Sequence, residues 1–176
     1  IIFPEMSLTG YPVLDLLFKK HFIDEVNKNL DKIIKTTHNI VAVIGLPRKS
    51  SEGLLYNSAI IIQNCKILGY RDKTHLPSYD VFDEKRYFSS AKSIEPIDIV
   101  FNGQSHKFGI QICEDLWDDI YDIDVTKELV SQKSEIVINI SASPFQINRV
   151  YQRHEKCCSK VKELKYFIYV NMVGNE

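Results

Sequence analysis

The sequence predicts an α/β fold, in which helices pack on β-sheets. Three observations support this prediction. Several apolar runs lack the polar alternation of half-exposed strands, which is typical of strands buried on both faces. Segments with helical spacing of apolar residues separate these runs. The 176 residues are 44% hydrophobic and 26% charged, as in an ordinary globular domain with a sizeable core.

The first half of the chain contains several predicted strands and one predicted helix. Residues 1–3 are a short apolar run, and residues 14–37 carry apolar side chains at helical spacing. Residues 39–47, "NIVAVIGLP", form a continuous apolar strand that its glycine and proline are expected to end. Residues 57–73, "NSAIIIQNCKILGYRDK", predict two strands across a turn near Asn64.

The second half begins with a polar, aromatic loop over residues 74–96. Residues 97–113 then predict a hairpin with Asn102-Gly103 at its turn, because that dipeptide favours a tight two-residue connection. Four further segments are a helix over 125–134, a buried strand over 135–141, a helix over 148–165 and a strand over 166–174. No repeat or linker interrupts the chain, so we expect a single domain over residues 1–176.

Charge and composition exclude several classes of protein. The formal net charge of -1 gives no bulk attraction to nucleic acid. No run approaches the ~18 apolar residues of a membrane span, and the first residues lack the basic head of a signal peptide. The four cysteines include no CxxC pair, so neither a zinc site nor a disulfide framework is expected. We expect a cytoplasmic protein that binds neither nucleic acid nor membranes.

The acidic stretch "EDLWDDIYDID", residues 114–124, is a candidate cation site. It lacks the glycine and the alternating oxygen ligands of a calcium loop, and acidic residues also favour the N-terminal ends of helices. We therefore expect a structural use of these acids and no metal. The sequence also lacks the glycine-rich loops that bind nucleotide phosphates.

Cys113 directly follows a predicted strand, and two interpretations are open for it. Free cysteines are often core residues, which is the simpler interpretation. A catalytic thiol instead needs a base, and His75 and His154 are candidates, although nothing in their spacing selects them.

Glu5 and Lys73 also come directly after predicted strands. In open α/β sheets, ligands collect at the carboxyl ends of the strands, so these side chains and Cys113 are candidates for one pocket. A glutamate can take the proton of a thiol, and a lysine can stabilise negative charge beside it. A lysine or glutamate after a strand is common, so spacing alone leaves this catalytic triad as one hypothesis among several.

Four successive motifs resemble one known family. They are "PEMSLTGYPVLDLL" (4–17), "YRDKTHLPSYDVFDEKRYF" (70–88), "GIQICEDLWDD" (109–119) and "NISASPF" (139–145). Over nearly the whole chain, they resemble the glutaminase domain of glutamine-dependent NAD synthetases, in the carbon-nitrogen hydrolase (nitrilase) superfamily. The resemblance implies a nitrilase-type αββα sandwich. It also implies a partial domain, truncated at both ends and incomplete at its N-terminal edge strand.

The resemblance implies roles for the three residues that follow strands. Glu5 corresponds to the general base, Lys73 to the cation that stabilises the tetrahedral intermediate, and Cys113 to the nucleophile that forms a thioester with glutamine. The backbone N–H of Glu114 would complete the oxyanion hole with Lys73. The positions that correspond to the glutamine-binding residues of the family are Tyr79, Phe82, Glu114, Ser143 and Arg149.

The substrate-binding residues have chemically sensible roles and simpler alternatives. Glu114 suits the α-ammonium group of glutamine, and Arg149 suits its carboxylate or the nearby acidic stretch. Alternatively, Tyr79 and Phe82 are core aromatic residues, and Arg149 is an exposed charge on a helix.

The resemblance also implies partners. Glutamine is the substrate, and its hydrolysis requires no metal or cofactor. Released ammonia passes to a synthetase domain that uses ATP and Mg to make NAD from nicotinic acid adenine dinucleotide, and this sequence contains no such domain. We also expect a homo-oligomer. Two alternatives remain: an inactive remnant of the glutaminase domain, and a related amidohydrolase with another amide substrate.

Overall fold

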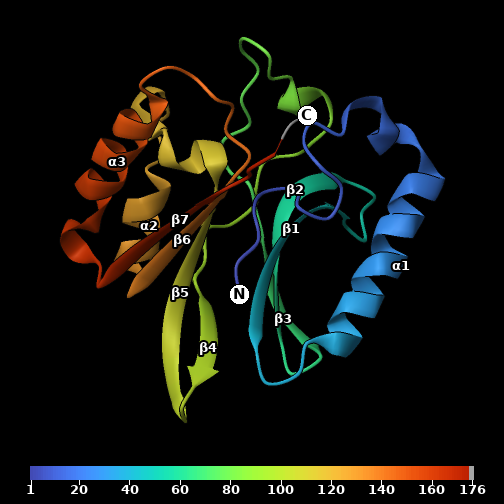
Figure 1. The fold of residues 1–176 in the computed structure, drawn as a ribbon, viewed down its shortest axis with the longest axis horizontal. Coiled ribbons are helices and arrows are strands. Elements are labelled where there is room, and N and C mark those ends of the chain that lie inside the picture. Colours follow the sequence, from blue (N-terminus) through green and yellow to red (C-terminus); the bar gives the residue numbers. More distant parts are fainter. Residues whose placement is uncertain (175–176) are drawn as a thin grey trace.

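Two β-sheets form the centre of the computed structural model, which describes residues 1–174 (Figure 1). The strands are β1 (Val41–Lys49), β2 (Leu55–Gln63), β3 (Lys66–Asp72), β4 (Ile97–Phe101), β5 (Gln104–Ile112), β6 (Ile136–Ser141) and β7 (Tyr166–Asn171). The first sheet is antiparallel, in the order β1-β2-β3. The second sheet has the order β4-β5-β6-β7, and its last three strands run parallel. The predicted α/β class is confirmed.

Helices cover the outer face of each sheet. The helices are α1 (Lys20–Thr36), α2 (Val125–Ser131) and α3 (Arg149–Lys160), with short 3-10 turns at Leu14–Phe18, Glu84–Arg86, Cys113–Leu116, Asp118–Ile120 and Val161–Glu163. Figure 1 shows α1 beside the first sheet and α2 and α3 beside the second. The order of layers is therefore helix, sheet, sheet, helix, which is the predicted αββα sandwich. Within residues 1–174, no helix has the length and apolar character to cross a bilayer.

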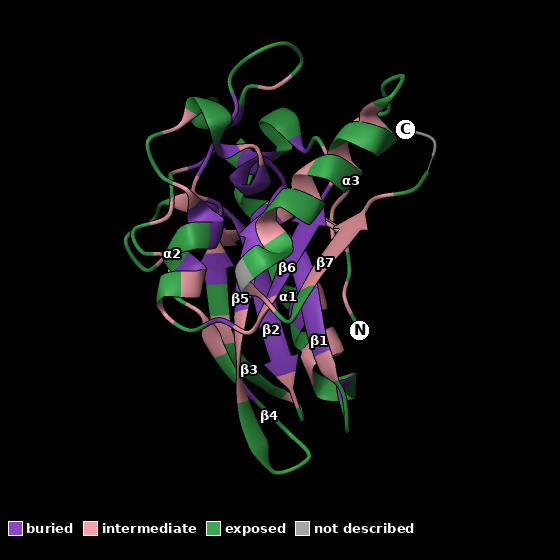
Figure 2. Ribbon diagram, turned by 90° about the vertical axis from the view of Figure 1, so that its left-hand side faces the viewer, coloured by how far each residue is buried: buried purple, intermediate pink, exposed green. Residues whose placement is uncertain are grey.

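The space between the two sheets holds the main apolar core. Val43 and Ile61 of the first sheet share one buried cluster with Ile110 and Ile138 of the second. The alternate residues of the first sheet form a second cluster with α1. Because both faces of the central strands are covered, these strands contain runs of consecutive apolar residues, and Figure 2 shows them as buried between more exposed helices.

Two of the boundaries that differ from the prediction have clear physical reasons. Pro47 does not end the strand over 39–47, because β1 continues to Lys49 and lies at the edge of its sheet, where a missing N–H is tolerated. The helix expected over 14–37 begins only at Lys20, since Lys19 has an extended backbone that separates α1 from the preceding 3-10 turn. The hairpin turn at Asn102-Gly103 is confirmed, and both residues have the positive φ that such turns require.

The first three residues form only a single parallel bridge, between Ile2 and Val43. Phe3 N–H donates to the Val43 carbonyl at 2.9 Å, and Val43 N–H donates to the Ile1 carbonyl at 3.0 Å. Ile2 also borders an apolar hollow of about 690 Å³ between the two sheets. The opening apolar run is therefore attached to the sheet by few contacts, yet it carries Glu5 directly after it.

Candidate active site

The structure brings together the three residues that follow strands. Glu5 follows the Ile2 bridge, Lys73 follows β3, and Cys113 follows β5. The Nζ atom of Lys73 lies 2.8 Å from Oε1 of Glu5, and both side chains are almost completely buried. Cys113 interacts electrostatically with both of these groups, so the two sheets jointly build one site.

Glu5 is held by three hydrogen bonds. Its Oε1 atom accepts from Lys73 Nζ at 2.8 Å and from the Asn57 side-chain amide at 2.7 Å, while Oε2 accepts from the Ala142 backbone N–H at 2.8 Å. Asn57 also accepts the backbone N–H of Lys73, at 2.8 Å, through its carbonyl. One residue of β2 therefore orients two of the three candidate catalytic groups.

Gly45 allows the Glu5 segment to approach β1. A Cβ atom at position 45 would lie 2.4 Å from the Pro4 carbonyl oxygen and 2.5 Å from the backbone nitrogen of Met6. Such distances are too short for any side chain, so the backbone around Glu5 can occupy this place only because residue 45 is glycine. The sequence pattern indicates this glycine only as the end of a strand.

Lys73 forms ion pairs with two carboxylates, those of Glu5 and Glu84. Its Nζ atom also lies 2.8 Å from Oε1 of Glu84, which accepts the Tyr11 hydroxyl at 2.8 Å. Burial alone would lower the pKa of Lys73, but Glu5 and Glu84 more than offset this and raise it well above its ordinary value. Burial raises the pKa of Glu84, and Lys73 only partly opposes the shift. The lysine is therefore a fixed cation at neutral pH.

Glu84, Tyr11 and Asn57 are site residues that the motif-based prediction did not include. Glu84 lies in a loop without periodicity, so no pattern marks it as buried. Asn57 carries a weak signal, because it is a polar residue at the start of a long apolar run.

Cys113 lies at a sharp turn between β5 and the 3-10 turn that follows. Its φ of 43° is a conformation that non-glycine residues rarely adopt and that is concentrated at functional sites. Burial, together with the Glu5 charge, raises the pKa of the thiol well above its ordinary value, although Lys73 opposes the shift. At neutral pH the site therefore holds a neutral thiol, and a base must remove its proton before the sulfur can attack.

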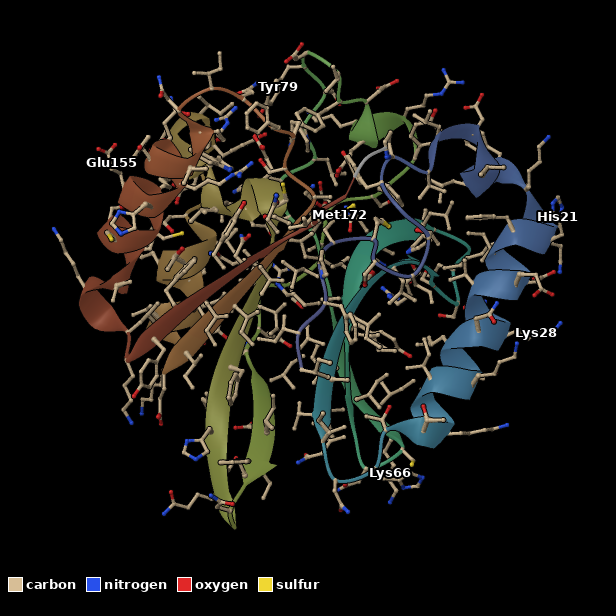
Figure 3. The ribbon with its side chains drawn as sticks, in the orientation of Figure 1. His21, Lys28, Lys66, Tyr79, Glu155 and Met172 are labelled. Carbon is tan, nitrogen blue, oxygen red and sulfur yellow. The ribbon has the colours of Figure 1, made fainter. Side chains whose placement is uncertain are left out.

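A pocket of about 190 Å³ opens beside Cys113. All of the predicted substrate-binding residues line it: Tyr79, Phe82, Glu114, Ser143 and Arg149. Tyr79 is 47% exposed, so its interpretation as a core aromatic residue is wrong, and Figure 3 places it at one end of the molecule, beyond the strands. Its ring contacts Phe82 edge-on, with 5.7 Å between the ring centroids.

Glu114 is the negative group of this pocket. Its Oε1 atom accepts hydrogen bonds from the hydroxyl groups of Tyr79, at 2.8 Å, and Tyr121, at 3.0 Å. Burial raises the pKa of Glu114, while the two phenol hydrogen bonds act in the opposite direction. Because both phenols bind the same oxygen, the second oxygen remains for another donor.

Arg149 is the positive group of the pocket. Its guanidinium lies over the Trp117 ring, 5.0 Å from the ring centroid, which is a cation–π contact. Its Nε atom is buried and has no hydrogen-bond partner within residues 1–174. The side chain is therefore oriented by a neighbour and still has a donor to offer, so it is not simply an exposed helix charge.

Two further residues fix the loop that carries Ser143. The Asn171 side chain accepts the Ser143 backbone N–H at 3.0 Å and donates to the Ser143 carbonyl at 3.2 Å. Arg153 donates to the same carbonyl at 3.1 Å and to the Ser143 hydroxyl at 3.0 Å. Neither residue carried a sequence signal of its own.

The histidine alternative receives no support from the contacts. The Nε2 atom of His75 lies 2.9 Å from the Ile123 carbonyl, and its ring stacks on Tyr121 with 3.9 Å between centroids. His154 lies beside Cys158 on α3. Among the residues that the structure describes, no group of three or more His, Cys, Asp or Glu side chains is arranged to hold a metal ion.

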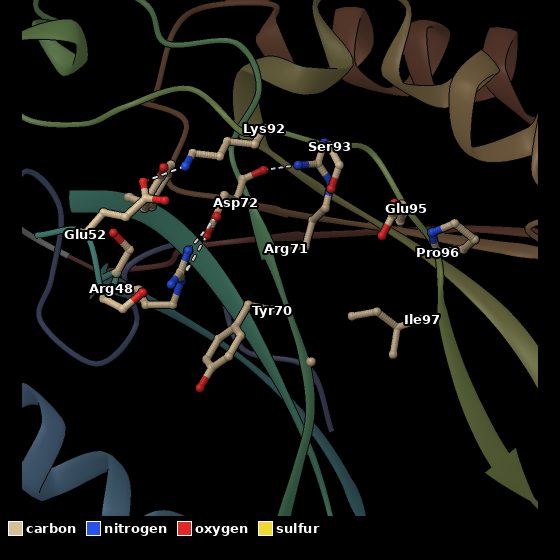
Figure 4. Close-up of a pocket in the computed structure, with 14 residues that line it drawn as sticks. Arg48, Glu52, Tyr70, Arg71, Asp72, Lys92, Ser93, Glu95, Pro96 and Ile97 are labelled. Carbon is tan, nitrogen blue, oxygen red and sulfur yellow. Dashed lines mark hydrogen bonds and ion pairs between the residues drawn. The ribbon is translucent and has the colours of Figure 1, made fainter. Parts of the chain in front are cut away.

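A second hollow, of about 350 Å³, lies on the first sheet beside the β3 strand end (Figure 4). Four of its charged side chains form two ion pairs: Arg48 binds the Asp72 carboxylate at 2.6 Å, and Lys92 binds Glu52 at 2.5 Å. This hollow contains none of the predicted site residues, and these ion pairs neutralise four of its charged side chains.

Comparison with known proteins agrees with this fold. A family described as carbon-nitrogen hydrolase matches residues 1–176. The glutamine-dependent NAD+ synthetase structure from Acinetobacter baumannii superposes with a TM-score of 0.87 at 33% identity, over 100% of this chain and 32% of that one. An amidase from Nesterenkonia sp. AN1 has a TM-score of 0.78 at 16% identity, over 99% of this chain and 65% of that one, and shows likeness of fold alone.

The layered fold is that of carbon-nitrogen hydrolases, and the family match over residues 1–176 shows that the chain belongs to the carbon-nitrogen hydrolase family. Its curated relatives include the glutamine-dependent NAD(+) synthetases of Aquifex aeolicus, 38% identical over 100% of this chain, and Acinetobacter baylyi, 37% identical over 100%. The chain spans 30% and 31% of the lengths of these two relatives.

Proposed function

We propose that this chain is a glutaminase, which hydrolyses the side-chain amide of glutamine through Cys113. One observation carries the proposal: Cys113, Glu114 and Arg149 line a single pocket. A free α-amino acid carries one ammonium and one carboxylate, so it complements a pocket with one charge of each sign. The names of the curated relatives support glutamine as that amino acid.

In the proposed mechanism, Glu5 removes the thiol proton as the Cys113 sulfur attacks the amide carbon of glutamine. Lys73 and the backbone N–H of Glu114 stabilise the oxyanion, because both are donors that are fixed before the reaction begins. Glu5 then donates the proton to the leaving nitrogen, so that ammonia departs and a thioester remains. Water, activated by Glu5, hydrolyses this thioester and releases glutamate.

Substrate orientation follows from the charged groups. The free oxygen of Glu114 binds the α-ammonium group, and Arg149 binds the α-carboxylate. Ser143, whose loop is held by Arg153 and Asn171, lies at the same pocket and contributes a polar contact. Tyr79 and Phe82 flank the aliphatic part of the substrate.

The names of the relatives also suggest where the ammonia goes. We propose that a synthetase domain or subunit, with ATP and Mg, receives it and makes NAD, as in a longer glutamine-dependent NAD+ synthetase. The glutaminase step itself needs no cofactor in this proposal. Homo-oligomer formation belongs to the same proposal and can be measured by light scattering of the purified protein.

The central test is Cys113→Ala. The unaltered chain is expected to release ammonia from glutamine and to form a glutamyl thioester on Cys113, detectable by mass spectrometry, whereas the variant should do neither. Cys158→Ala, at an exposed position on α3, is the matched control and should keep full activity. A folded parent chain without ammonia release, or a Cys113→Ala variant with the parental rate, would contradict the proposal and favour an inactive remnant or another mechanism.

A further inference from the structure

Asp115 is a completely buried carboxylate that contacts both strand ends of the site. Its Oδ1 atom accepts hydrogen bonds from the two backbone N–H groups of residues 74–75, at 2.9 and 2.8 Å, directly after Lys73. Its Oδ2 atom accepts the N–H of Ile112, at 3.1 Å, directly before Cys113. One side chain therefore binds the backbone next to the cation and the backbone next to the thiol.

These two strand ends belong to different sheets. Lys73 follows β3 of the first sheet, and Cys113 follows β5 of the second. The other backbone hydrogen bonds of Lys73, to Asn57 at 2.8 Å and from Ala91 at 2.9 Å, fix it without reaching the Cys113 turn. The Asp115 carboxylate instead fixes one strand end relative to the other.

The charge of Asp115 is balanced within the same network. A terminal nitrogen of Arg71 lies 3.8 Å from Oδ2 of Asp115, and both side chains are buried. The guanidinium also donates to the Asp72 carbonyl, as Figure 4 shows, and to the Thr74 hydroxyl at 2.6 Å. Moving the buried carboxylate would break its three N–H hydrogen bonds and separate its charge from the Arg71 cation, so its position is strongly fixed.

We propose that Asp115 is a positioning residue for the hydrolysis: it sets the distance between the Lys73 ammonium and the Cys113 thiol by joining the two sheets at the site. The proposal rests on the glutaminase function proposed above. Lys73 must lie where the oxyanion forms, and a displacement of about 1 Å can reduce a rate on the order of 10²-fold. Asp115 does not touch the substrate pocket, so its effect is expected in the chemical step and not in substrate binding.

The test is Asp115→Asn in the full chain. The amide is nearly isosteric but has one acceptor oxygen, so its NH₂ group must face either the Ile112 N–H or the two N–H groups of residues 74–75. We expect kcat for glutamine to fall on the order of 10²-fold while KM changes by less than about twofold. Asp122→Asn, the same change at an exposed position, is the matched control and should keep both parameters.

A second readout separates positioning from stability alone. The charged groups around the Cys113 thiol are Glu5, Lys73 and Glu84. If Lys73 recedes, the thiol loses its stabilising cation, so the pH profile of Cys113 alkylation by iodoacetamide should move to higher pH in Asp115→Asn. A merely structural role would lower the melting temperature without moving this profile.

The outcomes are distinct. A parental kcat, or a lower melting temperature with an unmoved alkylation profile, would overturn the proposal for Asp115. If Asp115→Asn does not fold, Asp115→Glu is measured in the same way, because it keeps the charge and displaces the carboxylate by one methylene. If the parent chain releases no ammonia from glutamine, the proposed function fails, while the alkylation profiles still decide whether Asp115 positions Lys73.

Discussion

At the scale of residues, neighbouring acids have different tasks. Glu114 faces the pocket, Asp115 joins two strand ends, and Asp118 binds Lys156 and Lys160 of α3, with 2.9 Å from Asp118 to Lys156. The sequence suggested only that Glu114 differs from the others. What separates them is the direction of each side chain at the Cys113 turn, which depends on backbone angles that no sequence pattern specifies.

Glu114→Gln tests the proposed contact with the ammonium group of the substrate. Loss of a charge-assisted hydrogen bond should raise KM for glutamine roughly 10- to 100-fold, with a smaller change in kcat. Burial raises the pKa of Glu114 above its ordinary value of 4.5, so in the parent chain KM should rise as pH falls through that raised value. Steady-state kinetics from neutral pH downward would show this dependence in the parent and not in the variant; a variant with the parental KM would exclude the contact.

At the scale of elements, Lys73 and Cys113 lie beyond the ends of strands and Glu5 beyond the Ile2 bridge, and what holds each group comes from other elements. Asn57 of β2 binds Glu5, the Ala142 N–H after β6 binds the same carboxylate, and Gly45 of β1 makes room for its backbone. The strands place the groups approximately, and the contacts between strands determine their geometry.

Gly45→Ala should damage the site without changing any polar group. The added Cβ would lie 2.4 Å from the Pro4 carbonyl oxygen, so the segment that carries Glu5 must move. We expect a loss of roughly 1–3 kcal/mol of unfolding free energy, measured by urea denaturation, together with strongly reduced ammonia release. Gly69→Ala in β3 is the control, since its Cβ would meet only the flexible end of Ile97, at 3.3 Å. Full activity in Gly45→Ala would show that Glu5 does not depend on this approach.

The sequence predicted the order of elements well, because apolar runs and helical spacing report burial directly. It also identified Glu5, Lys73 and Cys113 as candidates that the structure brings together. It missed Glu84, because a carboxylate in an irregular loop becomes buried only through contacts distant in sequence.

At the scale of the whole molecule, the site lies where two sheets with different strand directions meet. The first sheet is antiparallel and supplies Lys73, whereas the parallel part of the second supplies Cys113. The apolar core between the sheets holds Lys73 and Cys113 at fixed positions relative to each other. The buried ionisable groups therefore share one environment, which exists only in the folded state. Their pKa shifts therefore contribute to the stability of the entire domain.

Stability should fall at alkaline pH. Burial raises the pKa of Cys113 above its ordinary value of 9.0, so above about pH 9 the unfolded chain loses this proton while the folded chain keeps it. The raised pKa of Lys73 acts in the same direction above its ordinary value of 10.5. The free energy of unfolding should decrease by up to ~1.4 kcal/mol per pH unit for each such proton.

Chemical denaturation of the parent and of Cys113→Ala across pH 8 to 10 would check this expectation. The variant should have a flatter decline above pH 9, because it lacks the thiol proton. Equal slopes in the two proteins would show that Cys113 does not make this contribution.

The single bridge between Ile2 and Val43 has a consequence for the timing of catalysis. A segment held to β1 by three hydrogen bonds, beside an apolar hollow, opens by local fluctuation more easily than the core strands do. Each opening would withdraw Glu5 and leave the thiol without its proton acceptor. The fraction of molecules competent to react would then be set by this local opening equilibrium, and hydrogen exchange at the amides of Phe3 and Val43 would measure it directly.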